Sequence, residues 1–127
     1  MPSPRPDAPL TYEQRIANEW FPAINEGRVR PTPEQVDHLV RLYDGNLAYV
    51  DREVGVLRAR LEALGLWERT VVIVMADHGE QLFEDGYVGH SGQVREESAR
   101  VPLIVRFPEG RGPRGVRLPA LVDLTDL

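Results

Sequence analysis

The sequence predicts an α/β fold in which one long helix precedes a buried strand. Three observations lead to this prediction: apolar residues recur in steps of three or four over 36–64, a continuous β-branched run fills 71–76, and a second such run occupies 101–105. The first pattern is typical of one face of a helix, and the other two are typical of strands covered on both faces. Helix, strand, loop and strand in this order predict a layered domain with a mostly parallel sheet.

Composition fits one domain and disfavours several classes of function. The chain has 127 residues, 42% of them hydrophobic, and a net charge of −5; this is enough for a modest core. The absence of a basic stripe argues against nucleic acid as a partner. Without cysteine, disulfides, thiolate metal sites and cysteine nucleophiles are excluded. The sequence shows neither a signal peptide nor an apolar run near the roughly 18 residues of a membrane helix, so the cellular location stays open.

The N-terminal quarter of the chain is predicted to lie apart from the main domain. Residues 1–10 contain four prolines and are expected to form a loose tail. A short helix is predicted over 11–20, because a threonine and a glutamine at its start have capping-box spacing. The expected organisation is therefore a tail and short helix over 1–31, followed by the main domain over 32–127.

The long helix has clear start and stop signals. Thr32, Pro33 and Gln35 supply a capping threonine, a first-turn proline and a capping-box partner, and Gly65 is placed to end the helix. We expect the apolar stripe between them to pack as core against a sheet. The stripe consists of Val36, Leu39, Tyr43, Leu47, Val50, Val54, Leu57, Leu61 and Leu64.

Polar residues follow the first predicted strand directly. Asp77 and His78 come immediately after the run at 71–76, and Gly79 allows the backbone to turn closely around them. Ligands of open α/β sheets bind at the carboxyl ends of strands. Adjacent oxygen and nitrogen donors suit a divalent cation, although a lone Asp in such a place is more often a turn former and a lone His a satisfied polar group. A third strand is expected near 116–122.

Several motifs together resemble the later part of the catalytic domain of sulfatases, in the alkaline phosphatase superfamily. The resemblance covers roughly residues 34 to 110, in family order and with family-like spacing. Its most specific pieces are Asp77-His78-Gly79-Glu80, Gly89-His90, Glu96-Glu97 and Arg100-Val101-Pro102-Leu103-Ile104-Val105. The resemblance implies a partial α/β/α layered catalytic domain, with one long helix before the strand that leads to the metal site.

The resemblance also implies roles for individual residues. Asp77 and His78 match two metal ligands of the family, whose ion is usually calcium and acts as a Lewis acid on a sulfate ester. The nitrogen donor of His78 leaves manganese, magnesium or zinc open. His90 matches a catalytic position where the family has Lys or His touching the sulfate or leaving oxygen, although it can also be a loop residue without a task. The implied substrate is a small-molecule or glycan sulfate ester.

Three further polar residues are expected to stay outside the site. Asp85 stands where many relatives have His, which puts a role for it in doubt. Arg100 is expected to pair with Glu96 or Glu97, a structural contact. Glu80 is expected to be a helix-start carboxylate favoured by the local dipole.

The sequence departs from the family in what it lacks. Sulfatases carry their nucleophile in a C/S-x-P-x-R motif, but this chain has no Cys, and its serines are Ser3, Ser91 and Ser98, none of them in that motif. The family's two further metal-binding Asp residues have no counterpart either. We therefore expect a catalytic domain truncated at both ends, which needs the missing N-terminal segment as a partner and is inactive alone.

Three functions remain open at this stage. The first is a piece of a metal-dependent sulfatase. The second is a piece of a phosphodiesterase or phosphonate monoester hydrolase of the same superfamily. The third is a non-enzymatic α/β module that binds a partner through bare strand edges. The neighbouring reading frame separates them, since a C/S-x-P-x-R motif there supports the first and a Thr or bare Ser nucleophile the second.

Overall fold

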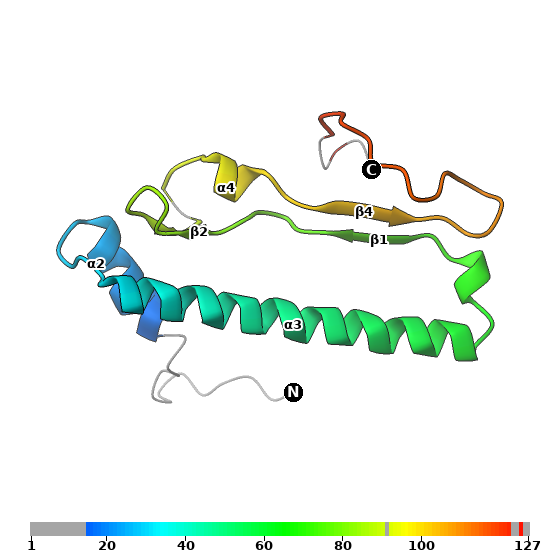
Figure 1. The fold of residues 1–127 in the computed structure, drawn as a ribbon, viewed down its shortest axis with the longest axis horizontal. Helices are drawn as coiled ribbons and strands as arrows, with labels where there is room; N and C mark the ends of the chain where they lie inside the picture. The colour runs from blue at the N-terminus through cyan, green and yellow to red at the C-terminus, as the bar shows by residue number, and fades with distance from the viewer. Residues whose placement is uncertain (1–14, 91, 123–124, 126–127) are drawn as a thin grey trace.

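One long helix runs beside two small antiparallel sheets in the computed structural model, which describes residues 15–90, 92–122 and 125 (Figure 1). In chain order the elements are η1 (Ile16–Trp20), α2 (Phe21–Asn25), α3 (Pro33–Ala63), η2 (Trp67–Arg69), β1 (Val72–Met75), β2 (Gln81–Leu82), β3 (Val88–Gly89), α4 (Glu96–Ala99) and β4 (Leu103–Arg106). Over the described ranges, no helix combines the length and the apolar content needed to cross a membrane. The mixture of helix and strand agrees with the predicted α/β class.

The start of α3 is the predicted capping box. The Thr32 N–H donates to Gln35 Oε1 at 2.8 Å, and the Gln35 N–H donates back to Thr32 Oγ1 at 3.4 Å. Hydrogen bonds from its own backbone N–H and then from the Thr32 hydroxyl hold the pKa of Glu34 below its ordinary value. The end of the helix is also as predicted, since Gly65 has a φ of +65° and its N–H donates to the Glu62 carbonyl at 3.0 Å.

Replacing Thr32 with alanine is expected to lower the free energy of unfolding by about 1 kcal/mol, because one orphan N–H of the first turn loses its acceptor. Urea denaturation followed by circular dichroism measures the change. Thr32→Ser keeps the hydroxyl oxygen and serves as the control, which should unfold close to the wild type. Equal stability of the alanine and serine variants would contradict a stabilising role for the cap.

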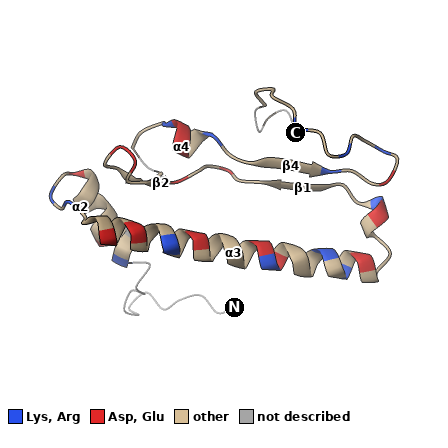
Figure 2. Cartoon of the chain, viewed as in Figure 1, with Lys and Arg blue, Asp and Glu red and all other residues tan. Residues whose placement is uncertain are grey.

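Charged residues of both signs are spread along α3 (Figure 2). Ion pairs one helical turn apart join Arg41 to Asp37 and Arg58 to Glu62. The pKa of Arg41 lies above its ordinary value because the guanidinium donates hydrogen bonds to the Asp37 carboxylate and is attracted by its charge. These side chains are exposed, and exposed pairs of this kind stabilise a helix only slightly.

The buried core gathers where the N-terminal helices meet the start of α3 and the hairpin of β2 and β3. Ile24 of α2, Leu39 of α3 and Val88 of β3 form its centre. Residues 11–14 of the predicted first helix lie outside the described residues, and the observed helical turns continue five residues beyond its predicted end, to Asn25. The core thus ties the N-terminal segment to the hairpin.

The two strand pairs run antiparallel, which corrects the mostly parallel sheet predicted for them. In the first sheet β1 pairs with β4 in the register Val72↔Arg106 to Met75↔Leu103. In the second, Gln81 faces Gly89 and Leu82 faces Val88. The connection from β1 to β4 holds a hairpin and the short α4 rather than a crossover helix, so the chain returns in the opposite direction. An apolar β-branched run indicates a strand but not its direction.

Burial of the long helix and of β1 is lower than predicted. In the apolar stripe of α3 only Leu39 is buried, while Leu47 and Val50 are 52% and 53% exposed. The strand β1 is covered on one side, with Ile73 and Met75 exposed. The structure describes no strand at 116–122, where one was predicted. The apolar patterns of α3 and β1 mark surfaces that are able to pack against other elements. The described residues do not include a layer that covers these surfaces.

Candidate active site

The turn after β1 is anchored on α4. Asp77 and His78 leave the end of β1, as predicted, and Gly79 follows them. The Gly79 N–H donates to the Ser98 carbonyl at 2.8 Å. A Cβ atom at Gly79 would lie 2.0 Å from the Glu97 carbonyl oxygen, so only glycine permits this approach. Close packing of the turn therefore fixes the direction in which the polar side chains leave the strand.

The hairpin register brings Glu80 next to His90. Gln81 faces Gly89 across the hairpin, so the next pair outward is Glu80 and His90, on one face of the ribbon. His90 Nδ1 lies 2.9 Å from Glu80 Oε2. The Glu80 side chain is 20% exposed and that of His90 is 50% exposed. The pair therefore has a largely buried carboxylate and a half-exposed imidazole.

The ring of His78 stacks on that of His90. Their centroids are 4.0 Å apart and the planes are inclined by 29°. His78 Nδ1 lies 2.9 Å from the Gly79 carbonyl oxygen. Asp77 Oδ1 lies 3.8 Å from His78 Nε2, at the rim, with its side chain 89% exposed. Of the predicted site residues, the structure thus brings the rings of His78 and His90 together. Asp77 lies at the rim, next to His78.

Three side chains at this place can hold a divalent cation. Ligand atoms of His78, Glu80 and His90 all lie within 4.8 Å of one another. Two imidazoles and one carboxylate suit zinc or manganese better than calcium, which prefers oxygen ligands. The donor set of these three described residues therefore fits a divalent metal, and Asp77 is not among them.

Glu80 is the functional candidate that sequence reasoning missed. It was expected to begin a helix, but in the described chain it leads into β2 at Gln81. Glu80 lies outside the regular strands and meets His90 because it directly precedes Gln81 in the hairpin register. A tight turn near Gly86, which folds His90 back toward Glu80, is the sequence signal that points to this contact.

Two neighbouring ion pairs lie outside the cluster. Arg100 Nη1 is 3.0 Å from Glu96 Oε1, so the expected pairing with Glu96 or Glu97 is confirmed for Glu96. Asp85 Oδ2 is 3.1 Å from Arg95 Nη1. Asp85 therefore has a partner on the surface and takes no part in the cluster.

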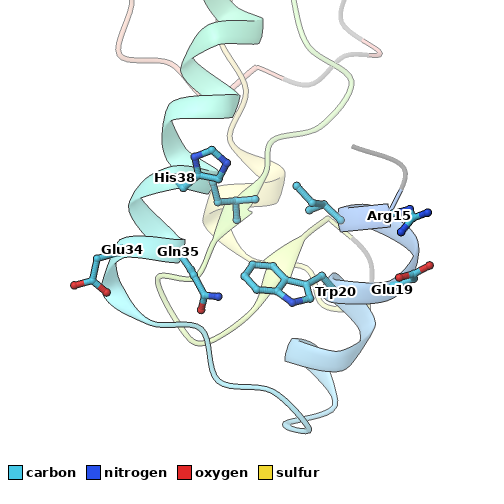
Figure 3. Close-up of a pocket in the computed structure, with 8 residues that line it drawn as sticks. Arg15, Glu19, Trp20, Glu34, Gln35 and His38 are labelled. Atoms are coloured by element: carbon cyan, nitrogen blue, oxygen red, sulfur yellow. The ribbon is translucent and has the colours of Figure 1, made fainter. Parts of the chain in front are cut away.

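A separate hollow of about 500 Å³ lies between η1 and the start of α3 (Figure 3). Trp20 and Leu39 line its apolar part, and Arg15 and Glu19 stand at its edge. Its lining contains none of the residues of the His78, Glu80 and His90 cluster. The hollow and the cluster are therefore distinct features.

Comparisons with known proteins give one consistent family. The family model described as Sulfatase matches residues 6–127. An ulvan-active sulfatase of Formosa agariphila is 31% identical over 67% of this chain and 17% of its own length. An endo-4-O-sulfatase of Bacteroides thetaiotaomicron is 37% identical over 59% of this chain and 15% of its own length. A multifunctional alkaline phosphatase superfamily protein of Trinickia caryophylli is 31% identical over 65% of this chain and 15% of its own length.

The chain thus spans about one sixth of the length of the curated relatives it matches. No solved structure matches it.

Proposed function

Since this chain belongs to the sulfatase family, we propose that it is the part of a metal-dependent sulfuric ester hydrolase that forms one wall of the metal and substrate site. The observation that carries the proposal is the meeting of His78, Glu80 and His90 beside Asp77, where β1 ends. These are metal-ligating and proton-transferring side chains in one accessible place.

Asp77 and His78 are the metal ligands in this proposal. The Gly79 carbonyl accepts from His78 Nδ1, which leaves Nε2 free for the ion, an arrangement common among metal-bound histidines. The family resemblance implies calcium as the usual ion, and the nitrogen donor of His78 leaves manganese, magnesium or zinc open. A bound divalent ion supplies Lewis-acid stabilisation of charge on the ester oxygens.

His90 acts on the leaving group. Half of its side chain is exposed, so a sulfate ester can approach the ring. As imidazolium it donates a hydrogen bond, and then a proton, to the departing oxygen. The substrate class is a small-molecule or glycan sulfate ester. The nucleophile comes from a C/S-x-P-x-R segment outside this sequence, and so we propose that the chain does not hydrolyse esters by itself.

Two alternatives have their own supporting observations. A phosphodiesterase or phosphonate monoester hydrolase is favoured by the likeness to the alkaline phosphatase superfamily protein of Trinickia caryophylli. A non-enzymatic binding module is favoured by the exposed apolar residues of the β1–β4 pair, such as Ile73 and Ile104. An unrelated gene upstream of this one would support the binding module.

The test compares the chain alone with the chain joined to the segment encoded upstream, using an aryl sulfate and an aryl phosphate with calcium or manganese. We expect hydrolysis of the sulfate only in the joined protein. In that protein His90→Ala should lower kcat about 10²- to 10⁴-fold, the usual contribution of general acid catalysis. His38→Ala, which changes a histidine of the separate hollow, is the control. Turnover by the isolated chain, or preference for the phosphate, would overturn the proposal.

A further inference from the structure

We propose that Glu80 is a positioning residue that keeps a proton on Nδ1 of His90 and so aims Nε2 outward. The use of that Nε2 on a leaving oxygen rests on the proposed function. The placement of the proton does not, because it follows from contacts within the chain. Glu80 lies ten residues before His90, and its Oε2 is 2.9 Å from His90 Nδ1.

The direction of this hydrogen bond follows from the chemistry of the two groups. An ionised carboxylate only accepts hydrogen bonds, so the proton between the two atoms belongs to Nδ1. A neutral imidazole has one N–H, so Nε2 then carries the free lone pair. The carboxylate of Glu80 therefore selects one of the two tautomers of His90.

The surroundings hold the Glu80 carboxylate in place. The next residue, Gln81, is 1% exposed and is fixed in β2. A Cβ atom at Gly89 would lie 3.7 Å from Glu80 Oε1 and 3.3 Å from the Phe21 ring. The carboxylate thus lies beside the Gly89 backbone, close to the Phe21 ring. Partial removal from water strengthens the hydrogen bond to His90.

His78 restrains the same imidazole from its other side. Its ring stacks on His90 at a centroid distance of 4.0 Å, which limits rotation of the His90 ring. His78 Nδ1 lies 2.9 Å from the Gly79 carbonyl oxygen, and a carbonyl also only accepts. Both rings therefore carry their protons on Nδ1, but only His90 depends on a side chain for it.

This arrangement defines where each proton goes when the sulfate ester is cleaved. Imidazolium His90 donates Nδ1–H to Glu80 and Nε2–H to the leaving oxygen. As the nucleophile of the proposed C/S-x-P-x-R segment forms its bond to sulfur, the bond from sulfur to the leaving oxygen breaks. That oxygen keeps the bonding pair and takes the Nε2 proton. The N–H electrons remain on Nε2 as a lone pair, and the ring returns to the neutral tautomer that Glu80 favours. In this step Glu80 only accepts the hydrogen bond from Nδ1 and exchanges no proton.

Nitrogen NMR of the whole chain tests the proposal without any substrate. The protein is labelled with ¹⁵N-histidine, and long-range nitrogen–proton spectra are recorded at a pH where imidazole is neutral. The chain has three histidines, which are assigned by single substitutions. We expect Nδ1–H with bare Nε2 for both His78 and His90. In Glu80→Ala the His90 signals should shift toward the Nε2–H form, while Glu80→Gln, which keeps an accepting oxygen, should preserve the wild-type pattern.

His78 is the internal control, because its Nδ1 acceptor is a backbone carbonyl that Glu80 does not supply. Glu96→Ala, which removes an exposed carboxylate paired with Arg100, is the matched variant and should leave both rings unchanged. If Glu80→Ala unfolds, Glu80→Met repeats the test with a side chain of similar volume. An Nε2–H tautomer at His90 in the wild type, or no change in folded Glu80→Ala or Glu80→Met, would overturn the proposal.

The two proposals fail separately. If the tautomers are as expected but the joined protein is inactive, the proposed hydrolase function is contradicted and the role of Glu80 stands. If the joined protein hydrolyses the ester but His90 carries its proton on Nε2, the role of Glu80 is contradicted and the hydrolase function stands.

Discussion

Replacing Asn25 with alanine is expected to lower the free energy of unfolding by about 2–4 kcal/mol. The Asn25 amide donates from Nδ2 to the Val88 carbonyl and accepts the Val88 N–H at Oδ1, both at 2.9 Å. Val88 is 2% exposed, so water cannot replace either bond. A buried backbone group left without a partner costs about 1–3 kcal/mol, and this substitution orphans two.

Urea denaturation followed by circular dichroism measures the effect of Asn25→Ala. Asn46→Ala is the matched control, because Asn46 is exposed on α3 and alanine is a better helix former. The control should unfold at the same urea concentration as the wild type or slightly above it. Equal stability of the two alanine variants would show that α2 is not held to β3 through this amide.

Replacing Gly79 with alanine is expected to disrupt the turn that carries Asp77 and His78. The new Cβ would meet the Glu97 carbonyl oxygen at 2.0 Å, and the atoms it meets are backbone, which cannot rotate away. Overpacking of this kind costs about 1–3 kcal/mol. We also expect loss of the hydrogen bond from the Gly79 N–H to the Ser98 carbonyl, and with it displacement of His78 from His90.

Two measurements follow the Gly79→Ala variant: the free energy of unfolding, and nuclear Overhauser contacts between the rings of His78 and His90. The control is Gly55→Ala in α3, where no atom lies within 4 Å of the added Cβ. That change should stabilise the protein by about 0.5–1 kcal/mol, because glycine weakens a helix interior. Intact ring contacts and unchanged stability in Gly79→Ala would contradict the close packing of the turn on α4.

Local signals predicted the long helix well. The capping box at Thr32 and the glycine at Gly65 act within a few residues, and both ends of α3 were correctly placed from them. Two of the three predicted strands were found. The strand β1 lies inside the run at 71–76, and β4 overlaps the run at 101–105 and extends to Arg106, while no strand is described at 116–122. Strand direction was predicted wrongly, because it depends on the path of the chain between β1 and β4. Burial of Leu47 and Val50 was overestimated because an apolar stripe shows where packing is possible and not what packs there.

The candidate site was predicted in part for a similar reason. The structure brings His78 and His90 together, and Asp77 lies next to His78. That these residues bind metal or touch a substrate remains a prediction. Glu80 was missed because its contact with His90 depends on the hairpin register. Which residue faces which across a hairpin cannot be read from motif spacing alone.

The short sequence distance between Glu80 and His90 has a consequence for how the site is assembled. Only ten positions separate the two residues, whereas Asn25 and Val88 are 63 positions apart. Bringing the ends of a longer loop together costs more conformational entropy. The contact between Glu80 and His90 therefore costs less entropy to form than the contact between Asn25 and Val88. A newly made chain can therefore join its imidazole and carboxylate before the distant helix has docked.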